Sequence, residues 1–258
     1  FKDFKFRHRS KKNQIIYTSK KVKNDDEVLN LIDNFLTEKN SFIFESVEKG
    51  KIKGRYTIFG KNPDKIWEFN NNNSYLIKNK KKIKLNDRPD QLIEKIIEDF
   101  KFETPKKLPK ICSLISGYFS YDSIRYIEKI PNKCKNDLNL PDVRLLRPRT
   151  LVIYDNLKKE IFYIINIFSD EKIKNYEKKY EEIKIELSKI LIQSSLKISN
   201  YLSKKTIKDI KVKSNTSKNN FIKMVNKAKD YIKLGDIFQV VLSQRFEAKL
   251  TKKPLDIY

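Results

Sequence analysis

The feature that most constrains the fold is a change of hydrophobic period within residues 216–250. Apolar side chains first recur every three or four residues, as on one face of a helix, at Phe221, Met224, Val225, Ala228, Tyr231 and Ile232. Thr216 or Ser217 would cap this helix, and Gly235 would end it. From Ile237 to Leu250 apolar residues alternate with polar ones, which predicts a strand with Gln239 on its less hydrophobic face.

The residues before this segment predict short strands with a few helices. Strands are expected at Ile15–Tyr17, Phe42–Ser46, Arg55–Phe59, Lys65–Asn70, Tyr75–Lys78, Lys82–Leu85 and Ser113–Tyr121, with a hairpin of Val143–Tyr154 and Ile161–Phe168. Gly60 is expected to end the third of them. Helices are expected after Asp25 and Asp26, at Asp87–Phe102 and from Glu171 to about Ser203. This succession predicts an α+β protein, with a frayed N-terminus that carries the single histidine, His8.

The polar, lysine-rich stretch 204–215 is expected to be a linker. It would separate an α+β domain at 1–203 from the beginning of a second domain at 216–258. That second domain is expected to be incomplete, because the chain ends within one turn of a helix start expected at Pro254.

Composition limits the class of protein. The formal charge is 57 − 33 = +24, which admits a basic RNA-binding or scaffold protein. The lysines are dispersed, however, and no basic surface interleaved with aromatic residues is visible, so nucleic acid is not the expected partner. Two cysteines without a CxxC motif indicate neither a zinc site nor a disulfide framework, so a reducing, cytoplasmic compartment is expected. No apolar run reaches the ~18 residues of a membrane span.

Four stretches carry a family resemblance. YIKLGDIFQVVLSQRF at 231–246 closely resembles the large subunit, component I, of anthranilate synthase. Three more agree in the same order: FIFESVEKGKIKGRYTIFG at 42–60, GYFSYDSIRYIEKIP at 117–131 and LPDVRLLRPRTLVIYDN at 140–156. The resemblance implies the N-terminal domain of that α+β fold, in which packed antiparallel sheets are flanked by helices. It also implies that the chain is truncated before the C-terminal catalytic segment.

The resemblance implies a function as well. Anthranilate synthase converts chorismate and ammonia to anthranilate and pyruvate in the first step of tryptophan biosynthesis, and L-tryptophan inhibits it. A glutamine amidotransferase subunit, component II, supplies the ammonia, and Mg2+ holds the substrate. The metal ligands and catalytic residues are expected beyond Tyr258, so this chain alone is expected to be inactive. Aminodeoxychorismate synthase component I is the alternative, although its strand is usually closer to YQVNLTQRF than to the VVLSQRF found here.

Four residues are candidates for a functional site. Glu45 and Ser46 resemble the family's LLES motif, which contacts the inhibitor L-tryptophan, and Arg55 would lie close to the same pocket. Gln239 occupies a position where relatives that use water as the nucleophile carry a lysine, so glutamine favours ammonia. Each candidate has a structural alternative: Ser46 ends a strand, Arg55 forms a surface pair, and Gln239 bonds within a sheet.

A further motif is interpreted as structural. Gly117 would allow close packing, and Asp122 would pair with Arg125 one helical turn away.

Overall fold

The computed structural model describes residues 1–22, 26–36, 38–45, 54–133, 136–194, 210–250 and 257. They belong to two compact units, Phe1–Ser199 and Asn200–Tyr258. Each unit is described by itself.

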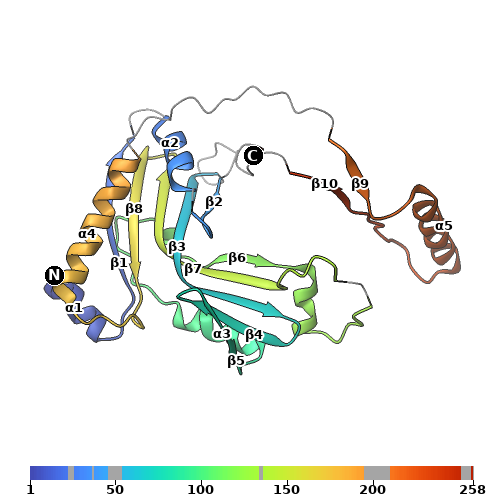
Figure 1. Ribbon diagram of the computed structural model, residues 1–258, viewed down its shortest axis with the longest axis horizontal. Coiled ribbons are helices and arrows are strands. Elements are labelled where there is room, and N and C mark those ends of the chain that lie inside the picture. The colour runs from blue at the N-terminus through green and yellow to red at the C-terminus, as the bar shows by residue number, and fades with distance from the viewer. Residues whose placement is uncertain are drawn as a thin grey trace. The chain divides into compact units, whose positions relative to one another are not determined.

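The first unit is built on an eight-stranded sheet (Figure 1). Its strands are β1 (Gln14–Lys21), β2 (Phe42–Phe44), β3 (Tyr56–Asn70), β4 (Asn73–Lys78), β5 (Lys81–Leu85), β6 (Ser116–Phe119), β7 (Val143–Asp155) and β8 (Glu160–Ile167). The order is β1-β8-β7-β3-β4-β5, with β2 beside β3 and β6 beside β7, and neighbouring strands are antiparallel. The predicted α+β class is confirmed, with these strands joined in one sheet.

The longest strands, β3 and β7, pair from Tyr56↔Asp155 to Phe69↔Val143, with a bulge between Pro63 and Lys65. The prediction that Gly60 ends a strand is wrong, because β3 continues through it. A Cβ atom on Gly60 would lie only 2.2 Å from Cζ of Phe42. The glycine therefore admits the Phe42 ring against the sheet instead of breaking the strand.

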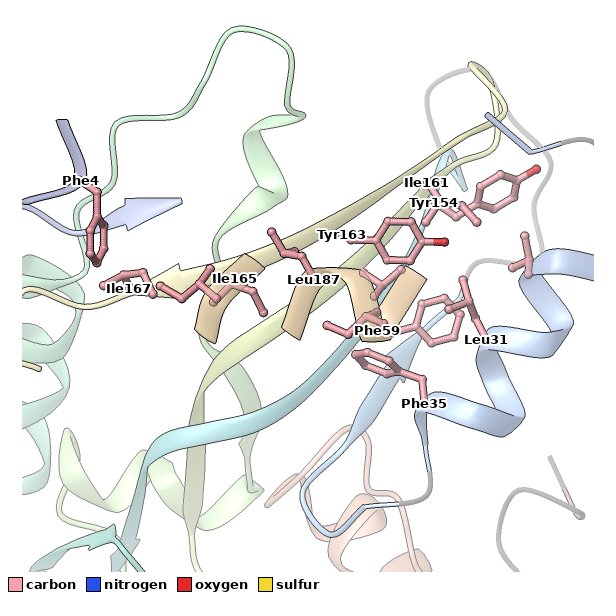
Figure 2. Packing of buried hydrophobic residues seen from close by; sticks show 14 residues of the cluster. Phe4, Leu31, Phe35, Phe59, Tyr154, Ile161, Tyr163, Ile165, Ile167 and Leu187 are labelled. Atoms are coloured by element: carbon pink, nitrogen blue, oxygen red, sulfur yellow. The ribbon is translucent and has the colours of Figure 1, made fainter. Parts of the chain in front are cut away.

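Three helices cover one face of the sheet: α1 (Lys2–Arg9), α2 (Asp26–Phe35) and α4 (Tyr176–Gln193). Figure 2 shows the resulting core, in which Leu31, Phe35 and Leu187 from the helices meet Phe59, Tyr163 and Ile165 from the strands. The helix predicted from Glu171 is confirmed as α4, which buries Ile183, Leu187 and Ile190. A separate cluster lies where α3 (Pro89–Asp99) packs its buried Leu92 and Ile96 near Trp67 and Phe69.

The opposite face is covered by the connection that contains the short helix η1 (Lys110–Cys112). Leu108 and Cys112 pack there against Ile153, Phe162 and Ile164. Strand β8 is consequently buried on both faces over its whole length. This accounts for its nearly continuous apolar sequence, which differs from the alternation of a half-exposed strand.

The N-terminus is a helix packed on the unit, so the expectation of a frayed end is wrong. Phe4 is buried, and its ring lies 5.4 Å from that of Tyr180. His8 is also buried, with Nδ1 3.1 Å from the Tyr176 hydroxyl. These contacts are all to α4, far along the chain, so local composition does not reveal them.

The second unit contains β9 (Val212–Ser214), α5 (Lys218–Leu234) and β10 (Phe246–Ala248). The predicted caps are confirmed: Ser217 Oγ accepts a hydrogen bond from the Asn220 amide at 3.3 Å, and Gly235 has a left-handed φ of 79°. The strand predicted from Ile237 to Leu250 is wrong in extent, because only β10 forms, paired with β9. Alternation supplies a face but no hydrogen-bonding partner. Among the described residues, Asn215 hydrogen-bonds Arg245 next to β10, and no strand pairs with 237–243. Strand β9 falls inside the stretch expected to be a linker.

An ion-pair network lies at the bulge between β3 and β7. The Arg147 guanidinium, with its side chain 11% exposed, binds both carboxylate oxygens of Asp64 and also Asp170. It stacks over the Phe168 ring at 3.8 Å, and Asp170 also pairs with Lys65. Burial alone would raise the pKa of Asp170, but Lys65 and Arg147 lower it to about 2. Because an unfolded aspartate titrates near ~3.9, this carboxylate stabilises the fold above about pH 4, and the contribution is lost as the pH falls toward about 2.

We expect Arg147→Met to lower the free energy of unfolding by about 2–4 kcal/mol at pH 7, since Asp64 would lose its partner in a largely buried place. Urea denaturation followed by the fluorescence of Trp67, the single tryptophan, measures the change. The difference from the parent should shrink between pH 7 and pH 3.

Arg88→Met is the matched control. Arg88 pairs with Asp90 at 3.1 Å, but its side chain is 67% exposed. Its loss should cost less than about 1 kcal/mol. Equal effects of the two substitutions would contradict the importance of the Arg147 network.

Candidate functional site

Two of the predicted site residues flank one connection at an end of the sheet. Strand β2 pairs with β3 through Phe44↔Ile58. Glu45 directly follows β2, and Arg55 directly precedes β3. Ser46 lies outside the described residues. The antiparallel pairing thus brings Glu45 and Arg55 to the same end of two neighbouring strands.

The aromatic residues of β2 form an apolar surface beside this end. The rings of Phe42 and Phe44 lie 5.1 Å apart, and Phe44 is 47% exposed. Ile43 points to the other face, where it packs against the helix-covered core. Within β2, Phe42 and Phe44 therefore share one face of the strand, and Ile43 lies on the other.

Arg55 is held by a carboxylate from the neighbouring strand. Its Nε donates to Asp155 Oδ1 at 3.0 Å, and its Nη2 donates to Asp155 Oδ2 at 2.7 Å. Its guanidinium also lies 4.9 Å from the Tyr56 ring centroid, and its carbonyl accepts a hydrogen bond from the Asn156 amide at 2.9 Å. Both the backbone and the side chain of Arg55 are therefore fixed to the end of β7.

Asp155 is buried, with its side chain 2% exposed. Besides Arg55, it binds the β7–β8 turn, where Oδ1 accepts from the amides of Leu157 and Lys158 at 3.1 Å each. Burial alone would raise the pKa of Asp155, but the hydrogen bonds from Arg55 and from the Lys158 amide hold it below its usual value. The carboxylate is therefore ionised at neutral pH and stabilises the turn and Arg55 together.

The Arg55 side chain is 24% exposed and keeps donors for a ligand. A guanidinium carries five N–H groups, and Nη1 makes no hydrogen bond within the part of the chain that the structure describes. One N–H of Nη1 and the second N–H of Nη2 point in parallel away from Asp155, and such a pair suits the planar carboxylate of a small ligand. The ion pair expected of Arg55 is thus present, and its partner is the buried Asp155.

Asp155 was missed by the sequence analysis. The segment DNLKK beginning at Asp155 correctly indicated the turn of a hairpin. That Asp155 also binds a residue 100 positions earlier follows only from the β3–β7 register. No local pattern carries this information.

Gln239 is exposed and lies outside β10 within the second unit. The sheet face on which it was predicted is not formed there. Its proposed part in choosing the nucleophile stays a prediction.

The structural interpretation of the GYFSYD motif is confirmed. A Cβ atom on Gly117 would lie 1.9 Å from the Arg144 carbonyl oxygen, so only glycine fits. Arg125 Nε donates to Asp122 Oδ1 at 2.9 Å within the short helix η2 (Tyr121–Tyr126).

Neither a metal centre nor a membrane span is found in the described ranges. No three His, Cys, Asp or Glu side chains gather there as metal ligands, so these residues do not fit a Mg2+ site. None of the described helices combines the length and apolar character that a membrane crossing requires.

Known proteins resemble the chain over most of its length. Anthranilate synthase component 1 of Acetivibrio thermocellus is 34% identical over 236 residues, which cover 89% of this chain and 47% of that protein. The protein of the same name from Cereibacter sphaeroides is 27% identical over 266 residues, covering 100% of this chain and 53% of its own. The chain spans about half the length of the curated relatives it matches.

A solved structure agrees in fold. The crystal structure of anthranilate synthase component I from Streptococcus pneumoniae has a TM-score of 0.65 at 25% sequence identity, covering 82% of this chain and 46% of that one. A family model described as chorismate binding enzyme matches residues 39–258. Because this match extends over most of the chain, the protein belongs to the family of chorismate binding enzymes.

Proposed function

We propose that the chain is part of the large subunit of anthranilate synthase, which converts chorismate and ammonia to anthranilate and pyruvate. The observation that carries the proposal is the 34% identity to a component 1 protein over 89% of the chain. The same proposal includes a cytoplasmic enzyme, a glutamine amidotransferase partner that releases ammonia, and feedback inhibition by L-tryptophan. Mg2+ belongs to the proposal through the family resemblance alone, because the described residues form no site for it.

Within this function, the end of the sheet at Glu45 and Arg55 is proposed to bind the inhibitor. An amino acid offers a carboxylate, an ammonium group and, in tryptophan, an apolar indole ring. The Nη1 donors of Arg55 complement the carboxylate, Glu45 carries the charge opposite to the ammonium, and exposed Phe44 suits the ring. Ser46 would add a hydroxyl hydrogen bond from the connection that follows Glu45.

Gln239 is proposed to favour ammonia as the nucleophile. A water nucleophile needs a general base, and a glutamine amide has no titrating proton near neutral pH. Ammonia already carries a lone pair, so it adds to the ring without that base.

We expect the intact enzyme, supplied with chorismate, Mg2+ and ammonium, to release anthranilate, which its fluorescence and chromatography identify. Aminodeoxychorismate synthase, from the same family, aminates another ring carbon and retains the enolpyruvyl group. Formation of aminodeoxychorismate without pyruvate would overturn the proposal in favour of that alternative.

We expect Ser46→Ala to weaken inhibition by L-tryptophan, because one hydrogen bond to the inhibitor is lost. A loss of ~1–3 kcal/mol raises the inhibition constant roughly fivefold to a hundredfold. Inhibition is measured relative to the uninhibited rate of each variant. Ser41→Ala is the control, since the Ser41 hydroxyl donates to the Glu38 carbonyl at 2.7 Å. An inhibition constant equal to the parental one would remove Ser46 from the site.

We expect Gln239→Lys to lower anthranilate formation at least tenfold. An ammonium side chain would repel incoming ammonium, and a tenfold loss of rate corresponds to about 1.4 kcal/mol. Gln91→Lys, on an exposed position of α3, controls for the added charge. Chromatography of the chorismate products at fixed ammonium also reveals any isochorismate from water addition. If the variant forms anthranilate at the parental rate, Gln239 does not select the nucleophile and has only a structural role.

A further inference from the structure

Asp155 connects the Arg55 side chain to the β7–β8 turn by hydrogen bonds. Its four hydrogen bonds divide into two from Arg55 and two from the amides of the β7–β8 turn. All four end on one carboxylate that is nearly excluded from solvent. The direction of the Arg55 guanidinium is thus determined by the turn that joins β7 to β8.

The strand register makes this arrangement rigid. Tyr56, next to Arg55, is the partner of Asp155 across β3 and β7, and Asp155 is the partner of Glu160 across β7 and β8. Three strands therefore meet at this carboxylate. A side chain held in such a place loses little conformational entropy when it binds a ligand, which favours affinity.

The ion pair with Asp155 also determines which N–H groups of Arg55 are available to a ligand. Nε and one N–H of Nη2 are occupied by Asp155, so the edge formed by Nη1 and the second N–H of Nη2 is left for a ligand. Without Asp155 the long side chain would rotate among several rotamers, and its charge would be free to pair elsewhere. With Asp155 present, Arg55 offers two oriented donors instead of a mobile positive charge.

We propose that Asp155 is a positioning residue of the inhibitor site, acting through Arg55 to set the affinity for an amino-acid carboxylate. The inference rests on the proposed inhibitor site and assigns to it a residue that does not touch the ligand. It predicts that changes at Asp155 and at Arg55 have the same effect on inhibition and do not add.

Asp155→Asn separates the two roles of this residue. The amide oxygen of asparagine can still accept from the Leu157 and Lys158 amides and from Arg55 Nε. Its NH2 group would instead face Arg55 Nη2 across the present 2.7 Å contact, donor against donor. The substitution therefore preserves the turn and releases the guanidinium from its bidentate geometry.

Arg55→Lys is the companion variant, because lysine keeps the charge but not the planar pair of donors. Glu68→Gln is the matched control. Glu68 accepts from Arg144 at 3.0 Å between the same two strands, near their other end. It tests the loss of a carboxylate–arginine pair that lies away from the inhibitor site.

The experiment titrates L-tryptophan against the intact enzyme, with chorismate and ammonium as substrates, and records thermal midpoints in parallel. Asp155→Asn and Arg55→Lys should each raise the inhibition constant about fivefold to thirtyfold, because one oriented hydrogen bond to a charged group is impaired. The double variant should stay within about twofold of the weaker-binding single variant. Glu68→Gln should keep the parental inhibition constant even where its thermal midpoint falls as much as that of Asp155→Asn.

The outcomes separate this inference from the proposed function. If Asp155→Asn keeps the parental constant while Ser46→Ala and Arg55→Lys raise it, the inhibitor site stands and the role of Asp155 is overturned. Multiplied effects in the double variant would also overturn it, because Asp155 would then act independently of Arg55. Parental constants in all variants, Ser46→Ala included, would overturn the inhibitor site itself. If Asp155→Asn yields no folded enzyme, Asp155→Glu, which displaces the carboxylate by one methylene, takes its place in the comparison.

Discussion

The antiparallel pairing of β3 with β7 is the constraint on which the first unit depends. It extends from Tyr56↔Asp155 to Phe69↔Val143, and every other strand of the sheet joins this pair directly or through one neighbour. The helix-covered core, the core under η1 and the cluster under α3 all include side chains from these two strands. A pairing between strands so far apart in sequence is entropically costly to close, so the buried apolar surface on both faces must offset that cost.

Charged side chains recur along the same pair of strands. Arg55 meets Asp155 at one end, Arg147 meets Asp64 at the bulge, and Arg144 meets Glu68 toward the other end. Each arginine has a carboxylate across the strand pair. The attraction between the two charges offsets the desolvation cost of a partly buried guanidinium. The pair at Arg55 differs from the other two because it lies at the end of the strand pair, where Asp155 also binds the β7–β8 turn.

The functional conclusion follows from the same geometry. The chain belongs to the chorismate binding enzymes, and the inhibitor site that we propose lies at the end of β2 and β3. There Arg55 is held by Asp155, and the Phe42 and Phe44 rings lie on one face of β2. Arg55 and the β7–β8 turn are linked because both bind one buried carboxylate. Site residues on exposed connections depend on supporting contacts of this kind.

The local elements could be predicted from the sequence: the capped helix α5 with Gly235, the β7–β8 hairpin and the close fit at Gly117. Each of them depends on contiguous residues, through periodicity, capping or a glycine. Four features depend instead on long-range contacts. Gly60 lies inside a strand, the N-terminal residues form a packed helix, the residues after Ile237 form little strand, and Asp155 is the carboxylate that holds Arg55. The reason is that these features depend on partners many residues away, and strand register, which no local pattern encodes, selects those partners.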